Sequence, residues 1–326
     1  MDRKHRILCF IFVFIVILTA ITGCGSAEES SKTQTETEGT TESKSERITE
    51  YGTEQGHSTE PEGSTEQEQK AAGIIITALS VGKADAILIE TGDVVCMIDT
   101  GEKEDGAYIL QALRQKGITG LDLLLITHYD KDHVGSAAEI ANSIPVTTIL
   151  LPDYVGERIE YLAFMEAIQD HEDVRVIREI TDYQNGNLNM RVYPAENAAD
   201  YINTEDEYDN DLSLVSMVTY GETRFLLTGD IEKKRISQML EAELNLDCDW
   251  IKLPHHGKYQ KAVKELLEVC TPEYAVLTVS QEEYAEEKTL EYLEEQGIEI
   301  YDTVNEDVIT YSDGSSIWIE GSCLQE

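Results

Sequence analysis

Short apolar runs alternate with amphipathic stretches from about residue 71 to the end of the chain. The runs "GIIITALS", "DAILIET" and "VVCMIDTG" are rich in β-branched residues and are separated by glycine and polar residues, which predicts a meander of strands. The next stretch, "AYILQALRQKGI", has apolar residues at helical spacing and ends at Gly117, which predicts a helix. The continuous apolar run "LDLLLIT" is typical of a strand buried on both faces.

The same alternation of strands and helices continues through the rest of the chain. Two hairpins are predicted, with turns at Gly221-Glu222 and Asp313-Gly314. Further helices are predicted over 135–144, 157–171, 231–244, 261–270 and 287–297, and strands over 146–152, 174–180, 188–195, 212–230, 248–257, 273–280, 298–303 and 307–320. This pattern predicts one large α/β domain over 71–326.

The N-terminal part of the chain has a different composition. A basic start, "MDRKHR", precedes an apolar run from Ile7 to Ile21, and this order predicts a secretory signal over residues 1–23. The following "ITGC" resembles the bacterial lipobox, in which the cysteine is lipidated, so Cys24 is the expected lipid attachment site. The alternative is an ordinary signal whose cysteine is incidental. Residues 24–70 are mostly Ser, Thr, Glu, Gln and Gly, which predicts a disordered acidic linker.

Charge and cysteine content narrow the function classes. The formal net charge of the chain is −39, which argues against non-specific binding of nucleic acid through the whole surface and suits a site that concentrates divalent cations. Cys96, Cys248, Cys270 and Cys323 fall within 71–326 without C-x-x-C spacing, so no zinc knuckle is indicated. The sequence alone does not pair these cysteines.

Three predicted strands end in polar clusters. "LLLIT" is followed by "HYDKDH", "RFLLTG" by Asp230, and "WIKLP" by a pair of histidines. Four of the seven histidines in the chain fall in these clusters, and ligands commonly bind at the ends of strands in α/β sheets. Imidazole and carboxylate ligands together suit zinc or manganese. For any one cluster alone, the alternative is a solvated or helix-capping loop.

The motifs "THYDKDHVGS", "LLTGD" and "LPHHG", in this order, resemble those of the metallo-β-lactamase superfamily. Within it they are most similar to the hydrolase domain of the competence protein ComEC and its free-standing relatives, as are "VGKADAILIE" and "NDLSLV". The resemblance implies an α/β fold, a four-layer αβ/βα sandwich with a metal centre at one edge of the paired sheets.

The resemblance also assigns roles to individual residues. It implies a first metal site at His128 and Asp130, a second at Asp132, His133 and His255, and a bridging carboxylate at Asp230. Asp132 and Asp230 are then the expected catalytic residues. Candidate contacts with substrate are His256, Asn210 and Lys258. A ligand role is the alternative for His256, and Asp85 matches a position near the site where a structural role is equally expected.

Several departures from the family pattern affect the expected chemistry. Asp130 stands where most of the superfamily has histidine, and no histidine matches the third motif, because His171 follows a predicted helix and is expected to be exposed. The first site is therefore short of imidazole and is expected to prefer manganese. After "VLTVS" the segment "QEEYAEEK" lacks the family's Asn and His-Pro. Basic residues over 233–235 and 252–264 are either solvated helix faces or a positive rim that draws in an anionic substrate.

These features together predict an exported hydrolase, lipid-anchored through Cys24 to the outer face of the cell membrane. One or two divalent ions would supply a metal-bound hydroxide. A phosphodiester, in DNA or a nucleotide, is the expected substrate, so the expected partners are membrane lipid and a small anionic substrate or nucleic acid. The alternatives are a hydrolase for a small ester, lactone or amide, and a catalytically degenerate metal-bound binding protein at the cell surface.

Overall fold

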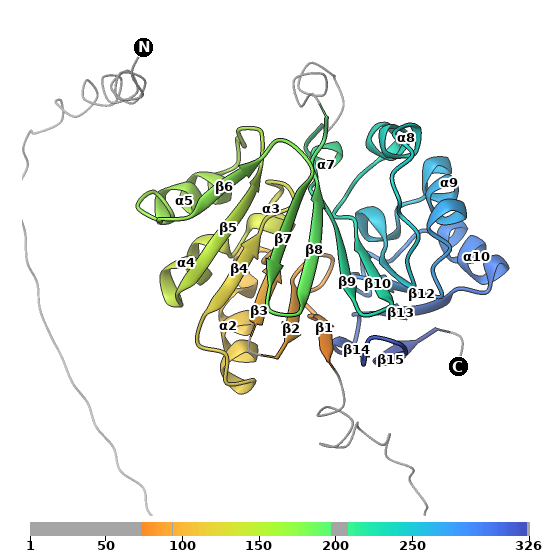
Figure 1. Ribbon diagram of the computed structural model, residues 1–326, viewed down its shortest axis with the longest axis horizontal. Coiled ribbons are helices and arrows are strands. Elements are labelled where there is room, and N and C mark those ends of the chain that lie inside the picture. Colours follow the sequence, from red (N-terminus) through yellow and green to blue (C-terminus); the bar gives the residue numbers. More distant parts are fainter. Residues whose placement is uncertain (1–72, 93, 197–207, 325–326) are drawn as a thin grey trace, which may run out of the picture. The chain divides into compact units, whose positions relative to one another are not determined.

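The computed structural model describes residues 73–92, 94–196 and 208–324. Within these ranges the strands form two eight-stranded sheets (Figure 1). The first sheet has the order β15-β14-β1-β2-β3-β4-β5-β6. Its strands are β1 (Ile74–Ala78), β2 (Ile87–Thr91), β3 (Val94–Ile98), β4 (Leu121–Leu125), β5 (Val146–Pro152), β6 (Val174–Ile177), β14 (Val308–Ser312) and β15 (Ile317–Glu320).

The second sheet has the order β16-β13-β12-β11-β10-β9-β8-β7. Its strands are β7 (Thr181–Asn185), β8 (Leu188–Tyr193), β9 (Val215–Tyr220), β10 (Thr223–Leu227), β11 (Trp250–Lys252), β12 (Tyr274–Leu277), β13 (Glu299–Asp302) and β16 (Ser322–Cys323). Both sheets are mixed: β3 to β6 run parallel to one another, as do β10 to β13, whereas the β1-β2-β3 and β7-β8-β9-β10 segments are antiparallel.

Helices cover the outer face of each sheet. One group packs on the first sheet and comprises α2 (Gly106–Gln115), α4 (Ala137–Ser143) and α5 (Ile159–Ala167). The other packs on the second sheet and comprises α8 (Lys233–Glu241), α9 (Lys261–Cys270) and α10 (Glu287–Gln296). Figure 1 shows these groups on opposite sides of the paired sheets. Short helical turns, η2 (Lys103–Asp105), α3 (Lys131–Val134), α7 (Tyr208–Asp211) and η3 (Pro254–Gly257), lie in the connecting loops.

Three apolar layers hold these elements together. Leu124 and Ile126 pack against the helices of the first sheet, whereas Leu123 and Leu125 of the same strand pack between the two sheets. The continuous apolar run therefore forms a strand buried on both faces, as its sequence predicts. Trp250 joins the layer between the sheets. The four-layer αβ/βα sandwich implied by the resemblance is confirmed.

The strands and helices predicted over 73–92, 94–196 and 208–324 are present, with a few differences. The two hairpins turn at the predicted glycines, between β9 and β10 and between β14 and β15. Strand β7 was not predicted, because "TDYQN" has no apolar alternation. In the structure β7 is an edge strand whose five side chains are all partly or fully exposed.

The described residues contain no helix with the length and apolar composition that a membrane crossing needs. The predicted signal over residues 1–23, Cys24, and the linker over 24–70 lie outside the described residues, as does the predicted boundary at residue 71.

Candidate metal centre

The loop after β4 brings the first polar cluster to one edge of the first sheet. Asp130 precedes α3, and its carbonyl oxygen accepts hydrogen bonds from the backbone N–H groups of His133 and Val134, which closes this short turn. Within the turn, Asp132 and His133 are neighbours. His128 and His133 are fully buried, and their ring centroids are 4.0 Å apart.

The second sheet supplies the facing side chains. Asp230 follows β10 and is buried, and the histidine pair follows β11 in the turn η3. His255 and His256 both have left-handed backbone, with φ of 46° and 52°, and Gly257 follows with φ of 83°. Left-handed conformations are unfavourable for residues other than glycine, so these two histidines hold a strained turn. Such strain is frequent at functional sites.

Four side chains from the two sheets meet at this edge. Asp230 Oδ2 lies 3.3 Å from His133 Nε2 and 3.2 Å from His256 Nε2. Asp132 Oδ2 lies 3.6 Å from His256 Nε2. One ligand atom from each of Asp132, His133, Asp230 and His256 falls within 4.8 Å of the others, which is close enough for one ion to reach all four. We call this group the Asp230 cluster.

Three histidines at this edge have a ring nitrogen that is available to bind a metal. The Nε2 atoms of His128, His133 and His256 are buried and have no hydrogen-bond partner. Buried polar atoms are almost always paired, so three unpaired imidazole nitrogens in one place need an explanation. A divalent cation among two imidazoles and two carboxylates would satisfy His133 and His256, and this donor set suits zinc or manganese. The residues therefore fit a metal ion.

Other buried groups hold the two imidazoles of the cluster in orientation. His133 Nδ1 lies 2.8 Å from Asp99 Oδ2, and His256 Nδ1 lies 2.8 Å from the carbonyl oxygen of Thr278. Asp99 itself accepts hydrogen bonds from the N–H and the hydroxyl of Thr127. A ligating histidine usually donates its other ring N–H to a carboxylate or a carbonyl, which leaves the remaining nitrogen for the metal. Both histidines have this arrangement.

The carboxylates and imidazoles of the cluster shift one another's pKa in the direction that favours the charged forms. Burial alone would raise the pKa of the Asp230 carboxyl, but the positive charges of His256, His133 and Lys252 hold it well below its ordinary value. Burial alone would lower the pKa of His133, but Asp230 and Asp99 raise it well above the ordinary value. In the absence of metal, the carboxylates thus hold protons on the imidazoles. A bound cation would take the place of those protons, so metal affinity should rise with pH.

The residues expected to form a first metal site are less well grouped. His128 Nε2 lies 3.8 Å from Asp130 Oδ2. The other oxygen of Asp130 accepts a hydrogen bond of 2.8 Å from Arg158, so a guanidinium already partners this carboxylate. Burial lowers the pKa of His128 to about 4. The pair is close together but has few further donors around it.

The structure separates the two histidines of "LPHHG". His256 belongs to the Asp230 cluster, whereas His255 is farther out, with its Nε2 3.9 Å from Asp230 Oδ2. His255 Nδ1 lies 2.8 Å from Glu232 and 3.4 Å from the side-chain amide of Asn210. The expected ligand, His255, thus lies at the margin of the cluster, and the alternative ligand role for His256 has the better geometry.

Several of the basic residues over 233–235 and 252–264 are buried or paired with acidic groups, which counts against the positive rim and fits neither alternative fully. Lys252 is fully buried and lies inside the centre, where its ammonium contacts Asp85 and Asp230. Arg235 is also buried and donates hydrogen bonds to the carbonyl oxygens of residues 193 and 194. Lys258 is exposed, but it pairs with Glu232 at 2.8 Å. These side chains point inward or pair with acidic groups because the sheet and helix packing, which the sequence does not show, sets their direction.

Several residues of the site were not expected from the sequence. Asp99, Thr278 and Glu232 orient histidines, Arg158 partners Asp130, and Lys252 contacts two carboxylates. Asp99 could have been found, because it follows the apolar strand β3 as Asp230 follows β10. Asp85, for which site and structural roles were equally expected, lies beside Lys252 and accepts a hydrogen bond from the Thr278 hydroxyl.

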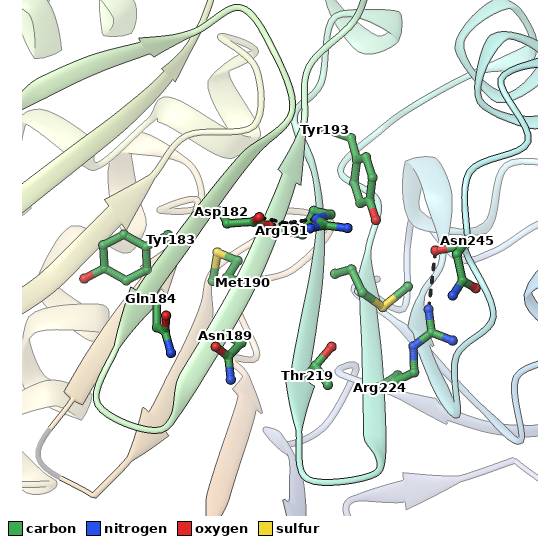
Figure 2. Close-up of a pocket in the computed structure, with 11 residues that line it drawn as sticks. Asp182, Tyr183, Gln184, Asn189, Met190, Arg191, Tyr193, Thr219, Arg224 and Asn245 are labelled. Carbon is green, nitrogen blue, oxygen red and sulfur yellow. Dashed lines mark hydrogen bonds and ion pairs between the residues drawn. The ribbon is translucent and has the colours of Figure 1, made fainter.

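A separate cavity of about 550 Å³ lies on the outer face of β7 to β10 (Figure 2). Its lining includes Gln184, Asn189 and Tyr193. Two arginines in the lining are already engaged, Arg191 with Asp182 and Arg224 with the carbonyl oxygen of Asn245. No residue of the Asp230 cluster lines this cavity.

Part of the chain is similar in sequence to known proteins. Residues 79–203 match the family model of the metallo-beta-lactamase superfamily. ComE operon protein 3 of Bacillus subtilis is 25% identical over 215 residues, which cover 65% of this chain and 26% of that protein. Recombination protein 2 of Haemophilus influenzae is 26% identical over 208 residues, which cover 62% of this chain and 24% of that protein. The chain thus spans about a quarter of the length of these curated relatives.

The chain is also similar to a solved structure. The metallo-beta-lactamase fold protein YhfI from Bacillus subtilis is 11% identical, with a TM-score of 0.47, and the match covers 76% of this chain and 100% of that one.

Proposed function

The chain carries a metallo-β-lactamase domain, and from that premise we propose that it is a metal-dependent hydrolase whose centre is the Asp230 cluster. Asp132, His133, Asp230 and His256 would hold the ion. His128 and Asp130, which lie beside the cluster, would complete the surroundings of the substrate. Asp230 would then be the central carboxylate of the site, and His255 would lie at its margin as a candidate substrate contact.

One observation carries this proposal. The buried Nε2 atoms of His133 and His256 both face Asp230 Oδ2 at 3.3 and 3.2 Å, in ion-pair contacts that lack the alignment of hydrogen bonds. Each ring is anchored at its other nitrogen, so neither can turn to find a partner elsewhere. A cation at this point would contact both imidazole nitrogens and the Asp230 oxygen at once, in place of the protons that Asp230 otherwise holds on the imidazoles.

A divalent ion held there would act as a Lewis acid and make a water-derived nucleophile available near neutral pH. The side chains around it have separate tasks. Asp132 is the most exposed member of the cluster, so it can accept a hydrogen bond from an attacking water. The nearby imidazoles hold the pKa of Asp132 below its ordinary value, against the effect of burial, so this carboxylate orients water and is a weak base.

The substrate that we propose is a phosphodiester, in DNA or a nucleotide. The support is the likeness to ComE operon protein 3 and to Recombination protein 2. Arg158, about half exposed beside Asp130, supplies a cation at the edge of the centre. Lys258 and Asn210 remain candidate contacts for an anionic substrate. Lipid anchoring through Cys24, with the domain on the outer face of the membrane, is part of the proposal and rests on the lipobox-like sequence.

The experiment has two parts. First, the metal content of the purified domain is measured after dialysis for the wild type, His133→Ala and the control His171→Ala, whose ring lies outside the cluster and bonds the carbonyl oxygen of Val146. Zinc or manganese should remain in the wild type and the control and be lost from His133→Ala. Absence of any retained ion in the wild type would overturn the proposal.

Second, the same proteins are assayed for hydrolysis of a phosphodiester, a carboxylic ester, a lactone and an amide, with and without added Mn²⁺. Phosphodiester cleavage that His133→Ala abolishes is the expected result. Cleavage of only the ester, lactone or amide would show that the proposed phosphodiester substrate is wrong. No cleavage by a protein that retains metal would indicate a binding protein.

A further inference from the structure

Lys252 places a permanent cation beside the centre. It lies on β11, in the middle of the second sheet, and its side chain is fully buried. Its ammonium lies 2.5 Å from Asp85 Oδ2 and 3.2 Å from Asp230 Oδ1, and it donates a further hydrogen bond of 3.1 Å to the carbonyl oxygen of Gly229. An ammonium has three hydrogens to donate, and here each has an acceptor, so this charge is fixed in one place.

The two carboxylate oxygens of Asp230 have different partners. Oδ1 faces Lys252, and Oδ2 faces His133 and His256. The carboxylate therefore offers the unpaired imidazole nitrogens one oxygen, while the ammonium occupies the other. Lys252 thus occupies the oxygen of Asp230 that the two imidazoles leave free for a second cation.

A second group of ligand types lies nearby, but its atoms are already used. Asp85, Asp99 and His133 have ligand atoms within 4.8 Å of one another. Asp85 is held by Lys252 and by the Thr278 hydroxyl at 2.6 Å. Asp99 is held by Thr127 and by His133 Nδ1. Only the Asp230 cluster, among these two groups, combines closeness with unpaired ligand atoms.

We propose that the Lys252 ammonium takes the place of a second metal ion, so that the Asp230 cluster retains a single ion. This inference rests on the proposed metal binding and goes beyond it. A lysine side chain cannot dissociate from the protein as a metal ion can. One of the two positive charges beside Asp230 is therefore present at any metal concentration. In this view Lys252 is a positioning residue, which fixes Asp230 and neutralises Asp85.

The test is to remove the charge and count the ions. Wild type, Lys252→Met, Lys252→Gln and Lys252→Arg are titrated with Co²⁺ by calorimetry and by visible absorption, which reports the coordination of the ion. The wild type and Lys252→Arg should retain one ion. Lys252→Met and Lys252→Gln should retain two, because Asp85 and Asp230 Oδ1 are then free to bind a cation. Lys252→Gln keeps a hydrogen-bond donor, so it remains informative if Lys252→Met does not fold.

The double variant Lys252→Met/Asp85→Asn is the matched control. It removes the lysine charge together with the carboxylate that would hold the additional ion, so it should return to one ion. Two retained ions in the wild type would overturn the inference. So would a single ion, with an unchanged spectrum, in both uncharged Lys252 variants. A wild type that binds no ion would instead refute the proposed function, so the two failures are distinguishable.

Discussion

Asp99→Asn should weaken metal binding without changing any residue of the Asp230 cluster. One Asp99 oxygen accepts from the Thr127 N–H at 2.7 Å, and the other lies 2.6 Å from the Thr127 hydroxyl and 2.8 Å from His133 Nδ1. Asparagine has the same shape but replaces one oxygen with an NH₂ group. Whichever way the amide turns, one of these buried positions loses its acceptor.

The size of the effect follows from these contacts. A buried donor without an acceptor costs about 1–3 kcal/mol of stability. Loss of the carboxylate that orients a ligating histidine reduces metal affinity by about 10- to 100-fold, which is ~1.4–2.7 kcal/mol of binding free energy. Because Asp99 lies 2.8 Å from the ring of His133, we expect Asp99→Asn to show both effects.

The assay compares Asp99→Asn with Asp302→Asn. Asp302 is also buried and accepts hydrogen bonds from the Tyr284 hydroxyl at 2.8 Å and from the Val304 N–H at 3.0 Å, but it has no contact with the cluster among the interactions of the described residues. Urea unfolding in chelator should show comparable destabilisation of both variants. Calorimetric titration with Mn²⁺ should show weaker binding only in Asp99→Asn. A Kd within twofold of the wild type would refute the role given to Asp99.

Three further predictions concern other parts of the chain. Burial lowers the pKa of His128 from 6.5 to about 4, so between these values the unfolded chain binds more protons than the folded one and stability falls as the pH falls. In chelator, this histidine should account for roughly 3 kcal/mol of loss between pH 6.5 and 4, and urea unfolding of His128→Gln should show a correspondingly smaller loss. Cys248 and Cys270 are buried and share a backbone hydrogen bond of 2.9 Å and a contact between their thiols. Refolding with oxidised glutathione should join them, with reduction of one glutathione disulfide to two thiols, and stabilise the fold by about 3 kcal/mol; peptide mapping that finds both thiols free would contradict this pairing. Cys24→Ala should release the protein into the medium, and a variant that stays in the membrane fraction would refute the lipid anchor.

Much of the fold could be predicted because the spacing of apolar residues along the sequence distinguishes its strands from its helices. "LDLLLIT" becomes β4 and is buried on both faces, and "KAVKELLEVC" becomes α9 with its apolar residues on one side. The edge strand β7 was missed because a strand exposed along an edge needs no apolar alternation.

The site was predictable as a region but less so residue by residue. The sequence indicates that the ends of β4, β10 and β11 carry ligands, and the structure brings these ends together. It does not indicate which histidine of "LPHHG" points inward, because the alternation of a strand is lost where both residues adopt left-handed backbone. Nor does it show that Lys252 points between the sheets, since a lysine in a short strand is usually exposed.

The Asp230 cluster draws Asp132 and His133 from the first sheet and Asp230 and His256 from the second. An ion held by all four would therefore link the two sheets and stabilise their packing, in addition to its role in catalysis. Its binding free energy would be shared with the packing of the layer between the sheets, where Leu125 and Trp250 lie. Removal of the ion should therefore destabilise both sheets. Amide hydrogen exchange should become faster in strands of both sheets, including strands far from the metal centre.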